Sequence, residues 1–378
     1  MTDAVRLHST ERLGYMKIAV YAIAKNEEKF VKRWYDSMKE ADGIFVCDTG
    51  STDNTASELK ALGVNVKVID VKPWRFDDAR NESLDFVDED YDICVCTDLD
   101  EVFSKGWRDK LESIWNENAT RGSYRYIWNF DENGNPKTTF NIEKIHLRHG
   151  FKWIHPVHEV LQYSGDKKDC TVIIDSITLS HYPDTTKSRA QYLPLLELSV
   201  KEDPEDDRNM HYLGREYLFN KEYEKAIKTL KQHLKLKSAL WADERCASMR
   251  YIAKCYNALG RNEEAYKWHL RSIAEAPHLR EPYIETAIFA SEQSDWYLCI
   301  YCINEALKIK TKPISYINEG YCWDSTPYDL LSIAYYNTEQ YLLAQKYAYL
   351  AYSKSNIDSR IAENIKIINE KIKSLRKN

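Results

Sequence analysis

Long apolar runs are missing from this sequence, and glycine and proline are scarce. The first apolar stretch, Ile18–Ala24, is far shorter than the roughly 20 residues that a membrane-spanning helix needs. With only 12 Gly and 10 Pro among 378 residues, a collagen-like or low-complexity chain is excluded. The composition, 43% hydrophobic and 30% charged, is that of a folded protein with room for two or three domains.

An excess of basic residues is also missing. The chain has 53 Lys and Arg against 59 Asp and Glu, a formal charge of −6. Binding to long nucleic acid depends strongly on contacts between basic side chains and phosphates, so the charge does not favour this class of partner. We expect a mixed-charge leader over residues 1–15 and a cytoplasmic protein without a transmembrane segment.

The nine cysteines are an odd number, and several fall in apolar patterns typical of buried elements. We therefore predict free thiols in a reducing compartment. Cys299 and Cys302 form a CxxC, but this motif lies in a helical pattern and has no second pair. Core packing explains it better than redox or zinc chemistry.

Residues 16–185 show short β-rich runs that alternate with helical spacing. Strands are predicted over 17–23, 43–48, 64–70 and 92–100, and the helix after the first strand has an apolar face formed by Phe30, Val31, Trp34 and Met38. This alternation predicts a parallel sheet covered by helices. From 122 to 181, β-rich segments separated by turn clusters indicate an irregular or antiparallel extension of that sheet.

Residues 186–378 show recurring pairs of helical segments. A tight polar turn is followed each time by a small residue, at spacings of 39, 34 and 45 residues: Ala226, Ala265, Cys299 and Ala344. A repeat near 34 residues with small residues at helix contacts resembles the tetratricopeptide family with insertions. An ordinary helical bundle is the alternative.

Asp48 closes the second predicted strand and is followed by Gly50 and a polar turn. Open parallel sheets bind ligands at the carboxyl ends of their strands, and a carboxylate there can accept hydrogen bonds from a ribose or base. The structural alternative is that Asp48, Ser51 and Asp53 only cap the turn and the next helix.

The fourth predicted strand ends in Asp98, Asp100 and Glu101. In a strand, residues two apart point to the same side, so we expect the carboxylates of Asp98 and Asp100 to converge. Two such groups repel each other unless they share a cation or a proton. Oxygen ligands of this kind suit Mg²⁺ or Mn²⁺ bound to a diphosphate.

The segment WIHPVHEV contains His155, His158 and Glu159, and His181 follows in LSHYPD. A histidine beside an acidic metal site can complete the ligand set, and a nearby glutamate can take a proton from a nucleophile. His155 can equally satisfy a backbone carbonyl. Pro156 indicates a strand or loop and not a helical zinc motif.

Five motifs together, AIAKNEE, CDTGSTDNT, DDARNES, TDLDE and PVHE, resemble inverting family 2 glycosyltransferases. The resemblance covers roughly residues 17–183. It implies an α/β domain of the GT-A, nucleotide-diphospho-sugar transferase type over 16–185, followed by an all-α tetratricopeptide-like domain over 186–378. A QxxRW motif is absent from the sequence, so polymer synthesis is not expected.

Site roles follow from this resemblance. It implies donor contacts from seven residues: Ala22, Ala24, Asn26, Asp48, Arg80, Asp98 and Leu99. It implies Mn²⁺ or Mg²⁺ bound by Asp100 and His181, with Asp98 as a further ligand or ribose contact. Glu159 becomes the general base, with Asp184 or Glu101 as substitutes. Acceptor-side candidates are His158, Trp153 and Trp323.

The expected function is transfer of a hexose-type sugar from a nucleotide-sugar, with UDP implied by the resemblance, to an acceptor hydroxyl or thiol of a peptide, a glycan or another molecule. The helical repeats would bind the acceptor or form a homodimer. One alternative is an inactive GT-A domain attached to a protein-binding scaffold. Another, a nucleotidyltransferase, would need a glycine-rich phosphate loop, and AIAKNEE contains no glycine.

Overall fold

The computed structural model describes residues 15–131, 133–184, 191–355 and 358–376. The chain divides into two compact units, Met1–Lys187 and Ser188–Asn378. Almost all of the expected leader, residues 1–14, lies outside the described residues, and so does the expected domain boundary at 185/186. Each unit is described by itself.

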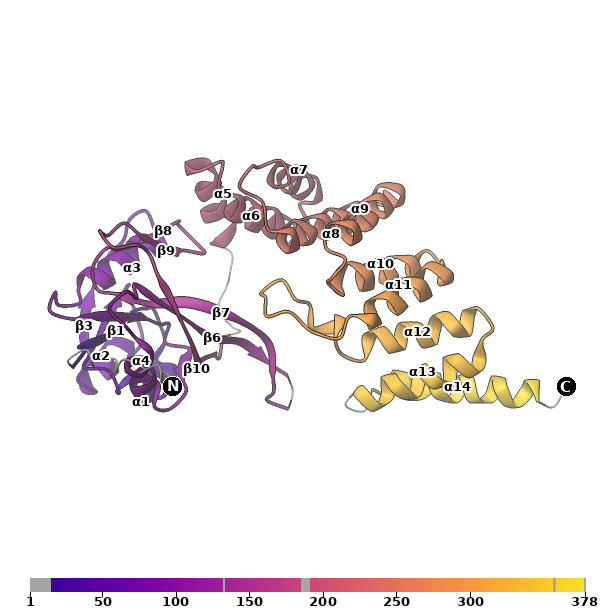
Figure 1. Cartoon of the computed structure of the whole chain (residues 1–378), viewed down its shortest axis with the longest axis horizontal. Helices are drawn as coiled ribbons and strands as arrows, with labels where there is room; N and C mark the ends of the chain where they lie inside the picture. The colour runs from indigo at the N-terminus through magenta and orange to yellow at the C-terminus, as the bar shows by residue number, and fades with distance from the viewer. Residues whose placement is uncertain (1–14, 132, 185–190, 356–357, 377–378) are drawn as a thin grey trace, which may run out of the picture. The chain divides into compact units, whose positions relative to one another are not determined.

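The first unit is built on an eight-stranded sheet of order β3-β2-β1-β4-β7-β6-β10-β5 (Figure 1). Its parallel half has apolar, β-branched sequences and contains the four expected strands: β1 (Ile18–Ala24), β2 (Gly43–Asp48), β3 (Asn65–Val68) and β4 (Ile93–Cys96). β1 lies in the middle of these strands and pairs in parallel with both β2 and β4. The predicted parallel sheet is therefore confirmed.

Helices accompany this sheet: α1 (Glu28–Met38), α2 (Thr55–Ala61), α3 (Phe76–Asp85) and α4 (Trp107–Ile114). The predicted apolar face of α1 is buried through Phe30, Val31, Trp34 and Met38. The indole of Trp34 also donates a hydrogen bond to Thr97 Oγ1 at 3.0 Å, just beyond β4. This contact connects α1 to the end of β4.

The other half of the sheet is mainly antiparallel, as the sequence predicted, although β10 pairs in parallel with β6. It contains β5 (Glu101–Phe103), β6 (Arg121–Phe130), β7 (Pro136–Leu147) and β10 (Thr171–His181). β7 pairs antiparallel with both β4 and β6, and β5 pairs antiparallel with β10. A separate hairpin is formed by β8 (Phe151–Ile154) and β9 (Val160–Tyr163).

The predicted strand 92–100 is too long, because β4 ends at Cys96. The chain then turns: the backbone N–H of Glu101 donates to the carbonyl of Asp98 at 3.0 Å. The Glu101 carboxylate accepts from the backbone N–H of Asp98 at 2.9 Å. The strand geometry invoked for Asp98 and Asp100 is therefore wrong, since both residues lie in a turn.

The second unit is entirely helical over its described residues. After α5 (Tyr192–Glu202), four helix pairs follow: α6 (Asp207–Phe219) with α7 (Tyr223–His233), α8 (Ala242–Ala258) with α9 (Asn262–Glu275), α10 (Glu281–Glu292) with α11 (Trp296–Lys308), and α12 (Thr326–Asn337) with α13 (Tyr341–Lys354). Helix α14 (Ser359–Leu375) ends the unit, and Figure 1 shows the pairs following one another. A short 3₁₀ turn, Gly320–Cys322, lies between α11 and α12. The expected all-α domain of repeated helix pairs is confirmed.

The four pairs share one turn. The second residue after the first helix has a left-handed backbone in each case, with φ between 59° and 71°: Lys221, Gly260, Ser294 and Glu339. The next N–H then donates back into the first helix at 2.8–2.9 Å, which is the Schellman arrangement. Five residues after each left-handed residue comes the predicted small residue, and all four of these are fully buried. The repeat is therefore encoded jointly by the turn and by the small contact residue.

Cys299 is one of these contacts, and Cys302 lies one turn further along α11. Both side chains are buried and free, and burial raises the pKa of each thiol to about 12. They pack in the core, as predicted.

Replacing Gly260 with Ala tests the shared turn. A Cβ at this position meets no atom within 4 Å, so the cost comes from the positive φ alone. We expect a loss of about 1 kcal/mol in the free energy of unfolding, measured by denaturant titration of the full chain. The matched change Ser294→Gly relieves the same strain and should not destabilise. An unchanged midpoint for Gly260→Ala would contradict this account of the turn.

A buried ion pair joins α8 to α10. Arg250 Nη1 lies 2.6 Å from Glu285 Oε1, and both side chains are at most 2% exposed. Lys254 and the Tyr321 hydroxyl also bind the same carboxylate oxygen, at 2.9 and 2.8 Å. Although burial opposes ionisation, these cations lower the pKa of Glu285 to about 2.

Glu285→Gln should lower the free energy of unfolding by about 3–5 kcal/mol at neutral pH, because Arg250 loses its buried counter-ion. The folded pKa lies below the usual 4.5, so this stabilisation is complete above about pH 4.5 and is lost as the pH falls toward 2. The difference between wild type and variant should shrink over that window in denaturation curves. Glu292→Gln, at an exposed position of α10, is the control. A difference independent of pH would refute the assignment.

Candidate active site

The loops that follow β1 and β2 are locked together. Asn26 has a left-handed backbone with φ 53°, which asparagine tolerates better than most residues. Its side-chain oxygen accepts the backbone N–H of Thr52 at 2.7 Å, and its own N–H donates to Ser51 Oγ at 2.9 Å. Asn26 was predicted to contact a donor, and in the structure its side chain fixes the neighbouring loop.

Asp48 has two differently used carboxylate oxygens. Oδ1 accepts the backbone N–H groups of Gly50 and Ser51 at 3.0 and 2.8 Å, which is the turn-capping role considered as the alternative. Oδ2 is buried and has no hydrogen-bond partner. A buried acceptor without a partner is costly, so this oxygen is suited to a donor group of a ligand. The Asp48 carboxylate can therefore cap the turn with Oδ1 and accept a hydrogen bond from a ligand with Oδ2.

Three predicted donor contacts lie in the core instead. Ala22, Ala24 and Leu99 are at most 3% exposed. The carbonyl of Ala22 accepts from Ser83 Oγ at 2.8 Å, and that of Ala24 accepts from the N–H of Thr49 at 2.9 Å. In this structure Ala22 and Ala24 hold neighbouring segments in place, and a donor contact at these three positions stays a prediction.

Arg80 is the centre of the polar network. It lies on α3, is 6% exposed and donates from its guanidinium to Asp98 Oδ1 at 2.9 Å and to Glu159 Oε1. The same guanidinium lies over the ring of Trp153, 5.3 Å from its centroid. Burial alone would lower the pKa of Arg80, but Asp98, Cys96 and Glu159 raise it, so the side chain is a permanent cation. It joins two carboxylates that are 61 residues apart in the sequence.

Lys144 and Glu101 complete this network, and the sequence reasoning missed the lysine. Lys144 Nζ, from β7, lies 3.2 Å from Asp98 Oδ2 and 3.3 Å from Glu101 Oε1. Glu101 is fully buried and also accepts from the Tyr126 hydroxyl at 2.8 Å. Burial raises the pKa of Glu101, whereas Arg80 and Lys144 together hold that of Asp98 well below its usual range. The signal in the sequence that could have identified Lys144 is a charged residue within the β-rich run that forms β7.

Asp100 and His181 face each other. His181 Nδ1–H donates to the carbonyl of Trp128 at 3.0 Å, which leaves Nε2 directed at Asp100 Oδ2, 3.2 Å away. The imidazole is stacked on Trp128 with ring centroids 4.5 Å apart. A histidine whose second nitrogen is held by a backbone carbonyl is oriented as metal-bound histidines are. Asp100 and His181 therefore fit the predicted divalent cation.

Asp98 does not join them as a ligand, which corrects the predicted set of three. Both of its carboxylate oxygens are engaged, one by Arg80 and the other by Lys144. Among the residues that the structure describes, Asp98, Asp100 and His181 do not form a group with all ligand atoms within 4.8 Å. In this structure Asp98 therefore pairs with two cationic side chains of the chain and not with Asp100 and His181.

Glu159 lies at the end of the β8–β9 connection, which is a loop as the sequence indicated. Two residues of α3 hold this hairpin: Asn81 exchanges hydrogen bonds with the backbone of Trp153 at 2.8 and 2.9 Å, and the N–H of Phe76 donates to the carbonyl of Pro156 at 3.0 Å. The Glu159 side chain is 11% exposed and ion-paired with Arg80. The predicted base is thus placed next to the predicted donor edge.

The three acceptor-side candidates have different surroundings in the structure. His158 precedes Glu159 in the same loop, with φ 53°. Trp153 is 3% exposed and its indole donates to the Tyr21 hydroxyl at 2.7 Å, so it is a core residue beneath Arg80.

Trp323 belongs to the helical unit. There its indole donates to Glu281 at 3.1 Å and lies against Arg280. Trp153 is therefore a packing residue, whereas the acceptor role of Trp323 stays a prediction. The substitute base Asp184 is ion-paired with Lys29 at 2.7 Å.

One known family matches most of the first unit. Residues 19–175 match the family described as Glycosyl transferase family 2. The match spans the parallel sheet, the Asp98–Glu101 turn, Arg80 and Glu159. This match supports glycosyltransferase activity of the first unit in general.

Solved structures resemble the chain in its helical part. The crystal structure of MamA protein shares 17% identity over 43% of this chain and 80% of that chain, with a TM-score of 0.34. The Cut9–Hcn1 structure of the APC/C shares 17% identity over 49% of this chain and 33% of that chain, with a TM-score of 0.39. No curated protein matches the chain. Within the described residues, no helix is both long and apolar enough to cross a bilayer.

Lys144→Met should destabilise the first unit by about 3–5 kcal/mol, because Glu101 and Asp98 lose a cation that they share in a buried setting. Urea denaturation followed by tryptophan fluorescence measures the loss. Lys152→Met, at an exposed position of β8, is the control and should change stability little. A Lys144 variant as stable as the control would show that this ion network is not needed for folding.

Proposed function

We propose that the first unit is a metal-dependent inverting glycosyltransferase that moves a hexose-type sugar from a nucleotide-sugar, with UDP as the expected nucleotide, to an acceptor hydroxyl or thiol. The observation that carries the proposal is the Arg80 bridge, which holds Glu159 beside Asp98 at the carboxyl edge of the parallel strands. The family 2 match over residues 19–175 supports the same class of reaction.

The donor would lie across the ends of β2, β1 and β4. These strands are adjacent, so Asp48 and the Asp98 turn are separated by about two strand spacings, roughly 10 Å. Asp48 Oδ2 offers an acceptor for a nucleoside hydroxyl or N–H group. Arg80 supplies positive charge on the side where a diphosphate would lie.

Asp100 and His181 would hold Mn²⁺ or Mg²⁺. The bound cation supplies Lewis-acid stabilisation of the negative charge that develops on the diphosphate leaving group. The residues of the chain do the remaining work. Trp128 fixes the orientation of His181, and Lys144 neutralises Asp98 and Glu101 so that the turn carrying Asp100 keeps its shape.

Glu159 would take the proton of the acceptor nucleophile as this attacks the anomeric carbon. A single displacement from the face opposite the leaving group inverts the configuration at that carbon. Arg80 acts by orientation, because its hydrogen bond fixes the Glu159 carboxylate while the α3 contacts hold the loop. His158, which precedes Glu159 in the same loop, is the side chain proposed to contact the acceptor.

Glu159→Gln should reduce turnover about 10²–10⁴-fold, because the amide cannot accept the proton. The assay is Mn²⁺-dependent hydrolysis of a panel of nucleotide-sugars, which requires no acceptor. Binding of the nucleotide product, measured by calorimetry, should change no more than threefold. Glu143→Gln, a half-exposed carboxylate on β7, is the matched control with unchanged activity.

Full turnover by the Glu159 variant would refute the assignment of the base and move attention to Asp184 or Glu101. A wild-type protein that neither binds UDP nor hydrolyses any donor would favour the alternative, an inactive domain joined to a helical binding scaffold.

A further inference from the structure

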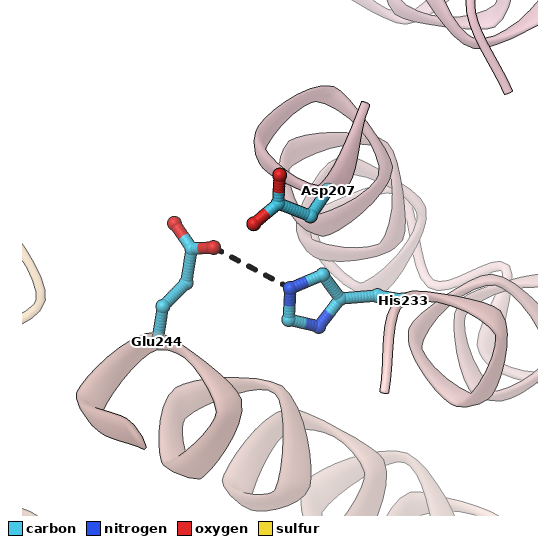
Figure 2. A group of neighbouring side chains, drawn as sticks. All are labelled: Asp207, His233 and Glu244. Atoms are coloured by element: carbon cyan, nitrogen blue, oxygen red, sulfur yellow. Dashed lines mark ion pairs between the residues drawn. The ribbon is translucent and has the colours of Figure 1, made fainter. Parts of the chain in front are cut away.

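Three ionisable side chains meet at the start of the helical unit, far in sequence from the site above. Asp207 is the first residue of α6, His233 is the last residue of α7, and Glu244 lies in the first turn of α8. One ligand atom of each lies within 4.8 Å of the other two. Figure 2 shows the three side chains pointing toward one another from three different helices.

The imidazole of His233 is the most informative member. Its side chain is fully buried, and Nε2 makes no hydrogen bond. The nearest carboxylate oxygen, Glu244 Oε1, is 3.4 Å away, which is long for an N–H···O hydrogen bond. Two ligands on one tetrahedral zinc ion, each bound at its usual distance, are themselves separated by about 3.3 Å. The separation observed here therefore suits two ligands of one cation.

The other ring nitrogen of His233, Nδ1, is hydrogen-bonded to Ser248. Ser248 Oγ lies 2.9 Å from His233 Nδ1 and 2.8 Å from His211 Nδ1. A hydroxyl has a single proton, so it can donate to only one of the two imidazoles, and the other must donate to it. When His233 donates through Nδ1, its Nε2 presents a lone pair to the two carboxylates. The Tyr316 hydroxyl donates to the remaining oxygen of Glu244 and orients this carboxylate.

The charges of these three side chains also favour a bound divalent cation. The cluster contains two carboxylates and one imidazole, which carries at most one positive charge. Buried like charges repel unless a cation is shared, and a divalent ion balances both carboxylates while the imidazole stays neutral. One nitrogen and two oxygen ligands on an oriented imidazole suit zinc and neighbouring transition-metal ions.

We propose that Asp207, His233 and Glu244 bind a divalent transition-metal ion, zinc in the first place, which joins helices α6, α7 and α8. Asp207 is partly exposed, so water can supply the remaining ligand. The ion would have a structural role, because it links the first helix pair to the next one. This site is independent of the glycosyltransferase proposal and stands or falls without it.

The test uses the full-length chain carrying Asp100→Asn and His181→Gln, so that the first unit cannot contribute its own metal ligands. After treatment with a chelator, Co²⁺ is added and the visible d–d absorption is recorded, and Zn²⁺ is then added to displace it. We expect one equivalent of Co²⁺ with a tetrahedral or five-coordinate spectrum, and an increase in melting temperature of several degrees on adding Zn²⁺.

Asp207→Asn is the decisive variant, because asparagine is tolerated at the start of a helix and the residue is not in the core. It should weaken Zn²⁺ binding at least tenfold and abolish the Zn²⁺-dependent increase in melting temperature. His233→Gln should do the same if it folds. The matched control is Asp243→Asn, the neighbouring acid on α8, whose carboxylate is ion-paired with His278 at 2.7 Å.

Equal Co²⁺ spectra and Zn²⁺ affinities for Asp207→Asn and Asp243→Asn would overturn the proposal, as would the absence of Co²⁺ absorption in the parent protein. Loss of binding in Asp207→Asn with retention in Asp243→Asn supports it.

Discussion

The candidate active site depends on charge neutralisation at the carboxyl end of the parallel sheet. Asp98 and Glu101 come from the turn after β4 and Glu159 from the β8–β9 loop, and repulsion between their carboxylates would destabilise this enclosed site. Arg80 and Lys144 prevent this, the first by joining Asp98 to Glu159 and the second by joining Asp98 to Glu101. The same two cations also determine which carboxylates can make further contacts. Asp98 is fully engaged, whereas Asp100 is left to His181.

In the helical unit, the same helix-pair geometry recurs although the sequences of the pairs differ. A left-handed turn residue and a buried small residue five positions later recur in all four pairs, while the turn residue itself varies between Lys, Gly, Ser and Glu. The backbone hydrogen bond after the turn is the invariant part. Buried ionic groups then connect neighbouring pairs, as Arg250 and Glu285 do between α8 and α10.

Most of the fold was predictable, and the site only in part. Apolar periodicity located β1, β2 and the buried face of α1, because a residue's side of a strand or helix follows from local geometry. The extent of β4 was not predictable, since a hydrogen bond from Asp98 to a side chain three residues later ends the strand. The buried position of Trp153 was also missed. An indole in a polar motif can pack in a core or face a ligand, and the motif alone does not distinguish the two.

The sequence by itself determined the division into α/β and helical parts, the family resemblance and the end of β2 at which Asp48 is found. These features depend on residues close together in the chain. Only the tertiary structure decided which charges meet. Arg80 contacts Glu159 across 79 residues, Lys144 reaches Asp98 across 46, and Asp207, His233 and Glu244 converge from three helices. Such contacts depend on how elements pack in space, and no local pattern of residues records that packing.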